Sequence, residues 1–183
     1  MKKHLTIQIL VLAVMTTSLA ARAETKPIGT VVQTPDKQPI VFKAPNGYMP
    51  ADLSKHTGKL LLDPKKPAGI FIGYPSDGQD IAGFTEEMKN TIAEMFLHNS
   101  KGRLWSSAVL PPHKGLDSES GNLMMTSDDN MEVQLALYVR ADKGIAYGYF
   151  AMRHRKAKGD DAKFLDSTGA GLKALDELAA SIK

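Results

Sequence analysis

Apolar and polar positions repeat along this chain with two different periods, and these periods separate predicted strands from predicted helices. The clearest strand covers residues 131–139, where every second residue from Met131 to Val139 is apolar. Such a period of two is typical of a strand with one buried face. The segment Ala141–Gly144 has turn chemistry, and residues 145–154 read as a returning strand. The pattern therefore predicts an antiparallel hairpin.

Shorter apolar runs bounded by Gly, Pro and Asn predict further strands. They cover residues 28–32, 40–43, 60–62, 69–74, 104–110 and 122–126. The runs 60–62 and 69–74 are apolar without interruption, which is typical of strands covered on both faces. Turns are predicted at residues 34–39 and at Ala44–Gly47, where Asn-Gly favours a tight turn.

Two segments have the period of an amphipathic helix. In the first, Thr85 is the predicted cap, a stripe of apolar residues follows, and Lys101 and Gly102 mark the predicted end. Its stripe consists of Met88, Ile92, Met95 and Phe96. The second begins near Asp161, and its stripe consists of Phe164, Leu165, Thr168, Leu172, Leu175, Leu178, Ala179 and Ile182. Both stripes are interpreted as core faces.

The elements alternate as strands, helix, strands, helix, and most neighbouring strands are joined by short turns. Short connections require antiparallel pairing. We expect an α+β fold, with an antiparallel sheet and two main helices packed on it. No repeat or linker divides the chain, so one domain is expected.

The segment Ile40–Tyr48, with the sequence IVFKAPNGY, and the closing helix Phe164–Ser181 resemble elements of the PsbP-like family. This family includes Mog-type and DcrB-like proteins. The tryptophan-containing strand that usually follows the family's opening turn does not follow here. The resemblance implies a PsbP-like sandwich and a binding or assembly role. The family shares no catalytic motif, so no functional residue is carried over.

The N-terminus has the pattern of a secretory signal peptide. Lys2 and Lys3 precede a mostly apolar run from residue 5 to residue 15, and Ala21–Arg22–Ala23 has the A-x-A form of a cleavage site. The apolar run is shorter than the ~20 residues that a membrane-spanning helix needs. We expect residues 1–23 to be removed and residues 24–183 to form a periplasmic or secreted domain, with no stable membrane insertion.

Charge and composition exclude several classes of function. The chain has 23 Lys and Arg against 20 Asp and Glu, but the predicted signal contains three of the basic residues and no acidic one. The exported domain is therefore balanced, which does not favour a nucleic-acid-binding protein. The chain has no cysteine, so thiol catalysis and cysteine-bound zinc are excluded.

No motif predicts a catalytic, metal or cofactor site. The histidines of the expected domain are His56, His98, His113 and His154, and none has the spacing of a metal site. The acidic pairs in Asp117–Glu119 and Asp128–Asp129 do not match a calcium loop, and the second is interpreted as part of a turn. No serine lies in a nucleophile elbow. Gly169–Ala170–Gly171 lacks the spacing of a phosphate loop and is interpreted as close helix packing.

One local patch is a candidate partner surface. Arg153, Arg155 and Lys156 concentrate positive charge at the predicted end of a strand. Such charges usually protect a strand against unwanted pairing. The alternative is an anionic partner, such as an acidic protein surface or a lipid headgroup.

Two hypotheses of function follow. The first is a non-enzymatic binding or assembly-accessory protein of the cell envelope, with a partner and an oligomeric state that the sequence leaves open. The second is a periplasmic hydrolase whose polar residues converge only in the fold. A cleft that gathers His56 or His113 with two carboxylates favours the second, and scattered polar residues favour the first.

Overall fold

The computed structural model describes residues 29–33, 39–51, 58–98, 104–155 and 161–183. For residues 29–33, 39 and 161–167 it describes the backbone only. Two helices lie in this part of the chain, α2 (Ile81–Phe96) and α3 (Asp161–Ser181). The strands are β1 (Gly29–Gln33), β2 (Pro39–Lys43), β3 (Met49–Ala51), β4 (Gly58–Leu62), β5 (Ala68–Gly73), β6 (Ser106–Leu110), β7 (Glu119–Ser127), β8 (Met131–Arg140) and β9 (Ile145–His154).

Seven of these strands form one antiparallel sheet in the order β3-β4-β5-β9-β8-β7-β6. The predicted hairpin is confirmed as β8 and β9, which pair from Met131 opposite His154 to Arg140 opposite Ile145. Gly144 has a φ of 62° in the turn between them. This backbone conformation suits a residue without a side chain. Strands β1 and β2 form a separate two-stranded ribbon.

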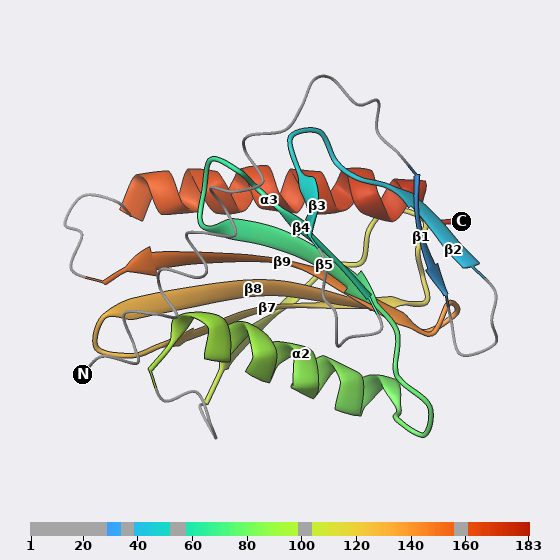
Figure 1. Cartoon of the computed structure of the whole chain (residues 1–183), viewed down its shortest axis with the longest axis horizontal. Coiled ribbons are helices and arrows are strands. Elements are labelled where there is room, and N and C mark those ends of the chain that lie inside the picture. Colours follow the sequence, from blue (N-terminus) through green and yellow to red (C-terminus); the bar gives the residue numbers. More distant parts are fainter. Residues whose placement is uncertain (1–28, 34–38, 52–57, 99–103, 156–160) are drawn as a thin grey trace.

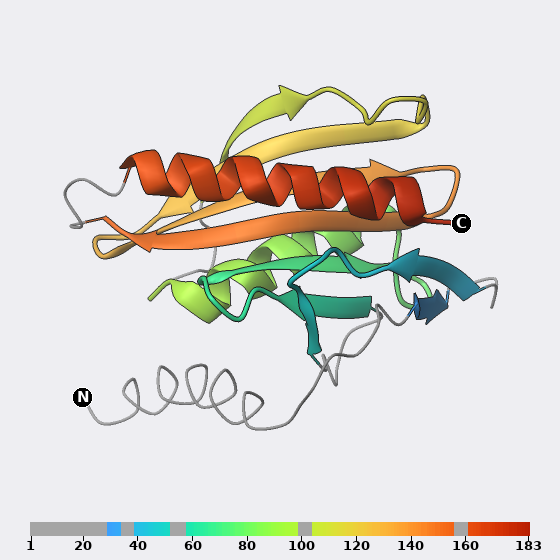
Figure 2. The same ribbon diagram turned by 90° about the horizontal axis from the view of Figure 1, so that it is seen from above.

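The helices lie on opposite faces of the sheet, so the domain has three layers (Figure 1). Figure 2 shows α3 running along β9, while β7 and β6 extend beyond it. The ribbon strand β2 packs at the C-terminal end of α3, where the Ser181 hydroxyl accepts the Lys43 amide N–H. The expected α+β class with two helices on an antiparallel sheet is confirmed.

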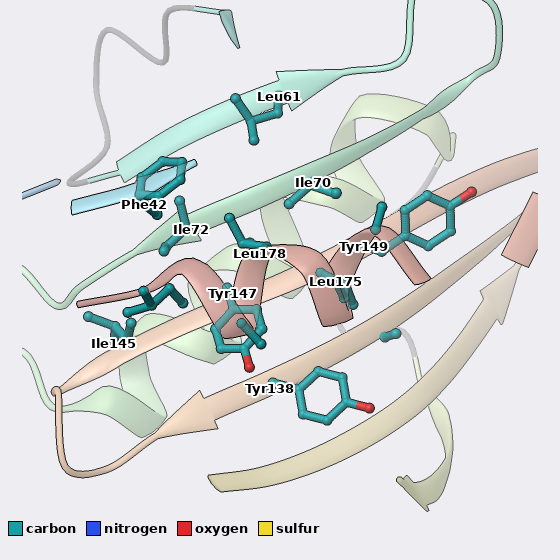
Figure 3. Packing of buried hydrophobic residues seen from close by; sticks show 14 of the residues in the cluster. Phe42, Leu61, Ile70, Ile72, Tyr138, Ile145, Tyr147, Tyr149, Leu175 and Leu178 are labelled. Atoms are coloured by element: carbon teal, nitrogen blue, oxygen red, sulfur yellow. The ribbon is translucent and has the colours of Figure 1, made fainter. Parts of the chain in front are cut away.

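Each face has its own hydrophobic cluster. The α3 side contains Phe42, Leu61, Ile70, Ile72, Tyr138, Ile145, Tyr147, Tyr149, Leu175 and Leu178 (Figure 3). The α2 side contains Phe71, Phe84, Met88, Ile92, Val133, Leu135, Leu137 and Phe150. Strand β5 is buried along its whole length, so the interpretation of the run 69–74 as a strand covered on both faces is confirmed for residues 69–73, whereas Tyr74 follows the strand and is half-buried.

The start of the first helix was predicted wrongly. Asp80, not Thr85, is its N-cap, and the Asp80 carboxylate accepts the Gly83 amide N–H at 2.6 Å. The Asp80 side chain satisfies a free amide of the first turn, whereas Thr85 lies inside the helix and donates to the Ala82 carbonyl. The helix ends at Phe96, earlier than predicted, and Lys101 and Gly102 lie outside the described residues.

Candidate functional site

Strand β8 sends side chains to both helix layers. Its apolar residues Val133, Leu135 and Leu137 face α2. On its other face, Gln134, Ala136 and Tyr138 lie toward α3 and are buried too, and Arg140 at the end of the strand is also buried. The polar positions Gln134 and Arg140 are therefore not exposed to solvent. Tyr138, on this same face, belongs to a polar cluster at one end of the sheet.

Glu119 is the centre of this cluster, which we call the Glu119 network and which consists of His113, Glu119, Tyr138, Tyr147 and Asp176. The Glu119 side chain is fully buried at the start of β7. One of its oxygens accepts the His113 amide N–H at 2.7 Å and lies 2.5 Å from Nδ1 of the His113 ring. The other oxygen accepts the Tyr147 hydroxyl. Glu119 thus joins β7, β9 and the connection between β6 and β7.

His113 connects this buried carboxylate to helix α3. The ring Nδ1 lies beside Glu119, and Nε2 faces Asp176 Oδ1 at 3.3 Å. The His113 ring also lies against the Tyr138 ring, with centroids 4.3 Å apart. The His113 side chain is 10% exposed, whereas that of Asp176 is 68% exposed. Only the Asp176 end of the network therefore reaches solvent.

A second ionic contact lies at the same end of the sheet. Arg140 donates through Nε and Nη2 to both oxygens of Asp142, at 2.9 and 2.7 Å. The Ser118 hydroxyl donates to the same carboxylate. Asp142 thus fixes the turn between β8 and β9 against the residue that precedes β7. This contact has the bidentate geometry that strengthens arginine–carboxylate pairs.

Burial and these contacts shift several pKa values. Burial, then the hydrogen bond to Glu119, raises the pKa of Tyr147 well above its ordinary value. Burial, then the charge of Glu119, raises the pKa of Tyr138. The hydrogen bond from Arg140 holds the pKa of Asp142 well below its usual range. Both tyrosines are thus kept neutral, and Asp142 is kept ionised.

The surface has a shallow recess of ≈ 260 Å³ at another place, which we call the α3 hollow. It lies between α3, β9 and the connections around β3 and β4. Its polar lining comes from Asn46, Tyr48, Asp63, Lys66, Tyr149, Lys173 and Glu177. The hollow presents charges of both signs. It does not include His113 or Glu119.

The candidate partner surface at the end of β9 is engaged within the domain. Arg153 donates to Glu132 at 2.9 Å through Nη2, and Arg155 donates to the Asp128 carbonyl at 3.0 Å. Lys156 lies outside the described residues. The structure therefore brings Arg155 to the connection between β7 and β8, and it pairs Arg153 with Glu132 near the start of β8, which offsets part of the positive charge.

Among the described residues, no group of three or more acidic or histidine side chains is placed to hold a metal ion. Within the same residues, no helix has the length and apolar character needed to cross a membrane. His98 is exposed just beyond α2, and its amide N–H donates to Asp128. His56 lies outside the described part of the chain. Comparison with known proteins gives no match, either to a protein-family profile or to a curated protein.

Sequence reasoning named His113 and Glu119 but not their partners Tyr138, Tyr147 and Asp176. The sequence contains one signal for Tyr147. Tyr147 and Tyr149 are two residues apart in the predicted strand 145–154, so their side chains are expected on the same face of that strand. Asp176 has no comparable signal, because its place beside His113 depends on how α3 lies across the sheet.

Proposed function

We propose that the chain is an exported, non-enzymatic protein of the cell envelope that binds or assists another envelope component. The observation that carries the proposal is the burial of Glu119, whose side chain is fully buried and whose two oxygens accept from His113 and Tyr147. A buried carboxylate that is hydrogen-bonded within the protein stabilises the fold and is not accessible to a substrate. The polar residues that the fold gathers are thus used internally.

Two surfaces are the candidates for the partner. The α3 hollow exposes Lys66, Lys173 and Glu177 beside Tyr48, a mixture that suits a polar protein surface with charges of both signs. The basic end of β9, with Arg153, Arg155 and Lys156, suits an anionic one. The three-layer architecture is also compatible with the PsbP-like sandwich, a relationship that we include in the proposal together with the secretory signal.

Site-specific photo-crosslinking in the envelope fraction tests this proposal. A photoreactive residue at Lys173 reports on the hollow, one at Arg155 reports on the basic end, and one at Asn90, exposed on α2, is the matched control. We expect one adduct of defined mass from Lys173 or Arg155 and none from Asn90. Reversal of the neighbouring charge, Lys66→Glu or Arg153→Glu, should then remove that adduct. Equal labelling from all three positions would contradict a specific binding surface.

A hydrolase is the second candidate function, and it is favoured because the fold brings His113 together with two carboxylates, Glu119 and Asp176, although the α3 hollow does not include them. A fully buried Glu119 orients His113 through Nδ1, and Nε2 points toward the exposed Asp176. A histidine held in this way by a carboxylate has the geometry of a general base. Turnover of aryl ester or phosphate ester substrates that disappears in His113→Gln, with Asn90→Ala unaffected, would favour the hydrolase over the binding protein.

A further inference from the structure

The two edges of the seven-stranded sheet differ in how they are protected. Strand β3 forms one edge, is three residues long and has Pro50 at its centre. Proline has no N–H to donate, so it prevents further pairing on an edge. Strand β6 forms the other edge, and among the described strands it pairs with β7 alone.

Strand β6 lacks the devices that usually protect an edge. No residue from Leu104 to Pro112 is charged, and no proline lies within the strand itself. Its side chains are exposed along almost the whole strand, with Val109 85% exposed and the preceding Leu104 93% exposed. Charged side chains, bulges and prolines are the usual means by which proteins prevent an exposed edge from pairing.

The helices leave this edge accessible. The main contacts of α2 are with β8 and β9, and those of α3 are with β9 and β2. Figure 2 shows β6 at the margin of the sheet, beyond α3. An incoming strand can therefore reach the backbone of β6 without displacing either helix.

We propose that this edge pairs with β6 of a second copy of the chain, antiparallel, so that the two sheets become continuous. A two-fold axis at Ala108 places Ser107 opposite Val109 of the second copy, and Ser106 opposite Leu110 of the second copy. No charge opposes a like charge, and each larger side chain faces a serine. This symmetric contact is the isologous arrangement that most homodimers use.

The strand that pairs with this edge is β6 of a second copy, because β6 is itself a strand that can add to such an edge. It is extended and uncharged, and the backbone groups on its outer side are free of strand pairing within the described residues. At the opposite edge of the sheet, Pro50 of β3 prevents pairing with a strand of a further copy. Pairing through β6 thus ends at a dimer and does not propagate into a fibre. This inference is independent of the proposed binding function.

Sedimentation equilibrium on the exported protein tests the dimer. We expect twice the mass of one chain and a dissociation constant raised roughly tenfold or more in Ala108→Lys, because two lysines then lie opposite each other at the axis. Met49→Lys on the opposite edge is the matched control and should remain dimeric. A parent protein that stays monomeric up to its solubility limit overturns the proposal, as does an Ala108→Lys variant that dimerises like the parent.

Disulfide trapping gives a second readout that does not depend on the folding of the lysine variant. The chain has no cysteine, so Ala108→Cys introduces a single thiol at the proposed axis, where paired strands lie close enough to form a disulfide. We expect mild oxidation to yield a covalent dimer from Ala108→Cys and none from Met49→Cys. Equal yields from the two variants would indicate random collision and would overturn the proposed contact.

Discussion

The two faces of the sheet are built with different chemistry. The α2 side is mostly apolar, with Ile92 and Phe150 almost fully buried, and its buried Thr126 donates to the Leu104 carbonyl. The α3 side combines apolar residues with buried polar groups, among them Glu119 and the Thr168 hydroxyl that donates to Gln134 at 2.5 Å. One layer is therefore stabilised mainly by apolar packing, and the other by packing and several paired polar groups.

This difference shows how one strand can serve two environments. Strand β8 places Leu135 toward α2 and Gln134 toward α3, and both are buried. A buried polar group costs free energy unless it is hydrogen-bonded. In the described residues, no buried side-chain nitrogen or oxygen lacks a partner. The α3 layer thus tolerates polar residues because each has a partner within it.

Loss of a large apolar side chain should have the largest effect, on both faces. We expect Phe150→Ala to lower the free energy of unfolding by about 3–5 kcal/mol and Leu175→Ala by about 2–5 kcal/mol, because each removes a buried side chain and leaves a cavity. Denaturant unfolding measures both, with the exposed Asn90→Ala as the control. A negligible cost for Leu175→Ala would mean that α3 is not part of the core.

Loss of the buried carboxylate should affect the α3 layer alone. We expect Glu119→Ala to cost near the upper end of about 1–3 kcal/mol, because the Tyr147 hydroxyl and the His113 amide lose their acceptor. Asp176→Ala, at the exposed end of the same network, should change the free energy of unfolding by less than about 0.5 kcal/mol. Equal costs for the two variants would show that burial of Glu119 does not matter.

Two glycines of α3 give a matched test of how closely that helix packs. A Cβ at Gly171 would lie 2.3 Å from the Tyr149 ring, whereas one at Gly169 would meet nothing within 4 Å. We expect Gly171→Ala to cost roughly 1–3 kcal/mol through overpacking. Gly169→Ala should be stabilising, by up to about 1 kcal/mol, since alanine favours the helix. Thermal unfolding of the two variants distinguishes them, and equal shifts would contradict the contact with Tyr149.

Much of the fold could be predicted from the sequence, because period and turn chemistry are local properties. The hairpin of β8 and β9, the helical stripe of Met88 and Ile92, and the turn at Gly144 were all predicted and are confirmed. The start of α2 was missed because Asp80 and Thr85 are both acceptable caps. Only the hydrogen bond from Gly83 to Asp80 distinguishes them.

The Glu119 network could be predicted only in part, because it depends on tertiary packing. Glu119 and His113 are close in sequence, but Tyr147 reaches them from β9 and Asp176 from α3. The period of two in β8 is typical of one buried face, but Gln134 and Arg140 on its other face are buried as well. Helix α3 covers Gln134 through Thr168, and the strand pattern alone does not reveal such a second layer.

The smallest expected effect is a difference in alkaline stability between the two faces. The pKa values of Tyr48, Tyr138 and Tyr147 are raised, in each case first by burial, and all three belong to the α3 side. Above the ordinary tyrosine pKa of about 10, the unfolded chain releases these protons while the folded chain retains them. The unfolded state then binds fewer protons, so stability falls as pH rises. Alkaline pH should therefore weaken the α3 layer selectively.

Tyr147→Phe isolates one of these groups. The variant should lose about 1 kcal/mol at pH 8, because a buried hydrogen bond to Glu119 is removed. At pH 10.5 the parent should lose about 0.8 kcal/mol of its free energy of unfolding, because this tyrosine titrates in the unfolded chain. The variant has no such group, so the two unfolding free energies should converge.

Phe96→Leu, on the α2 side, is the control for Tyr147→Phe. It adds or removes no titrating group, so it should lower the free energy of unfolding equally at every pH. Urea unfolding at pH 8, 9.5 and 10.5 measures all three proteins. Parallel curves for the parent and Tyr147→Phe would mean that the Tyr147 hydroxyl reaches solvent in the folded state, and the chemical distinction between the two faces would then be smaller than the contacts indicate.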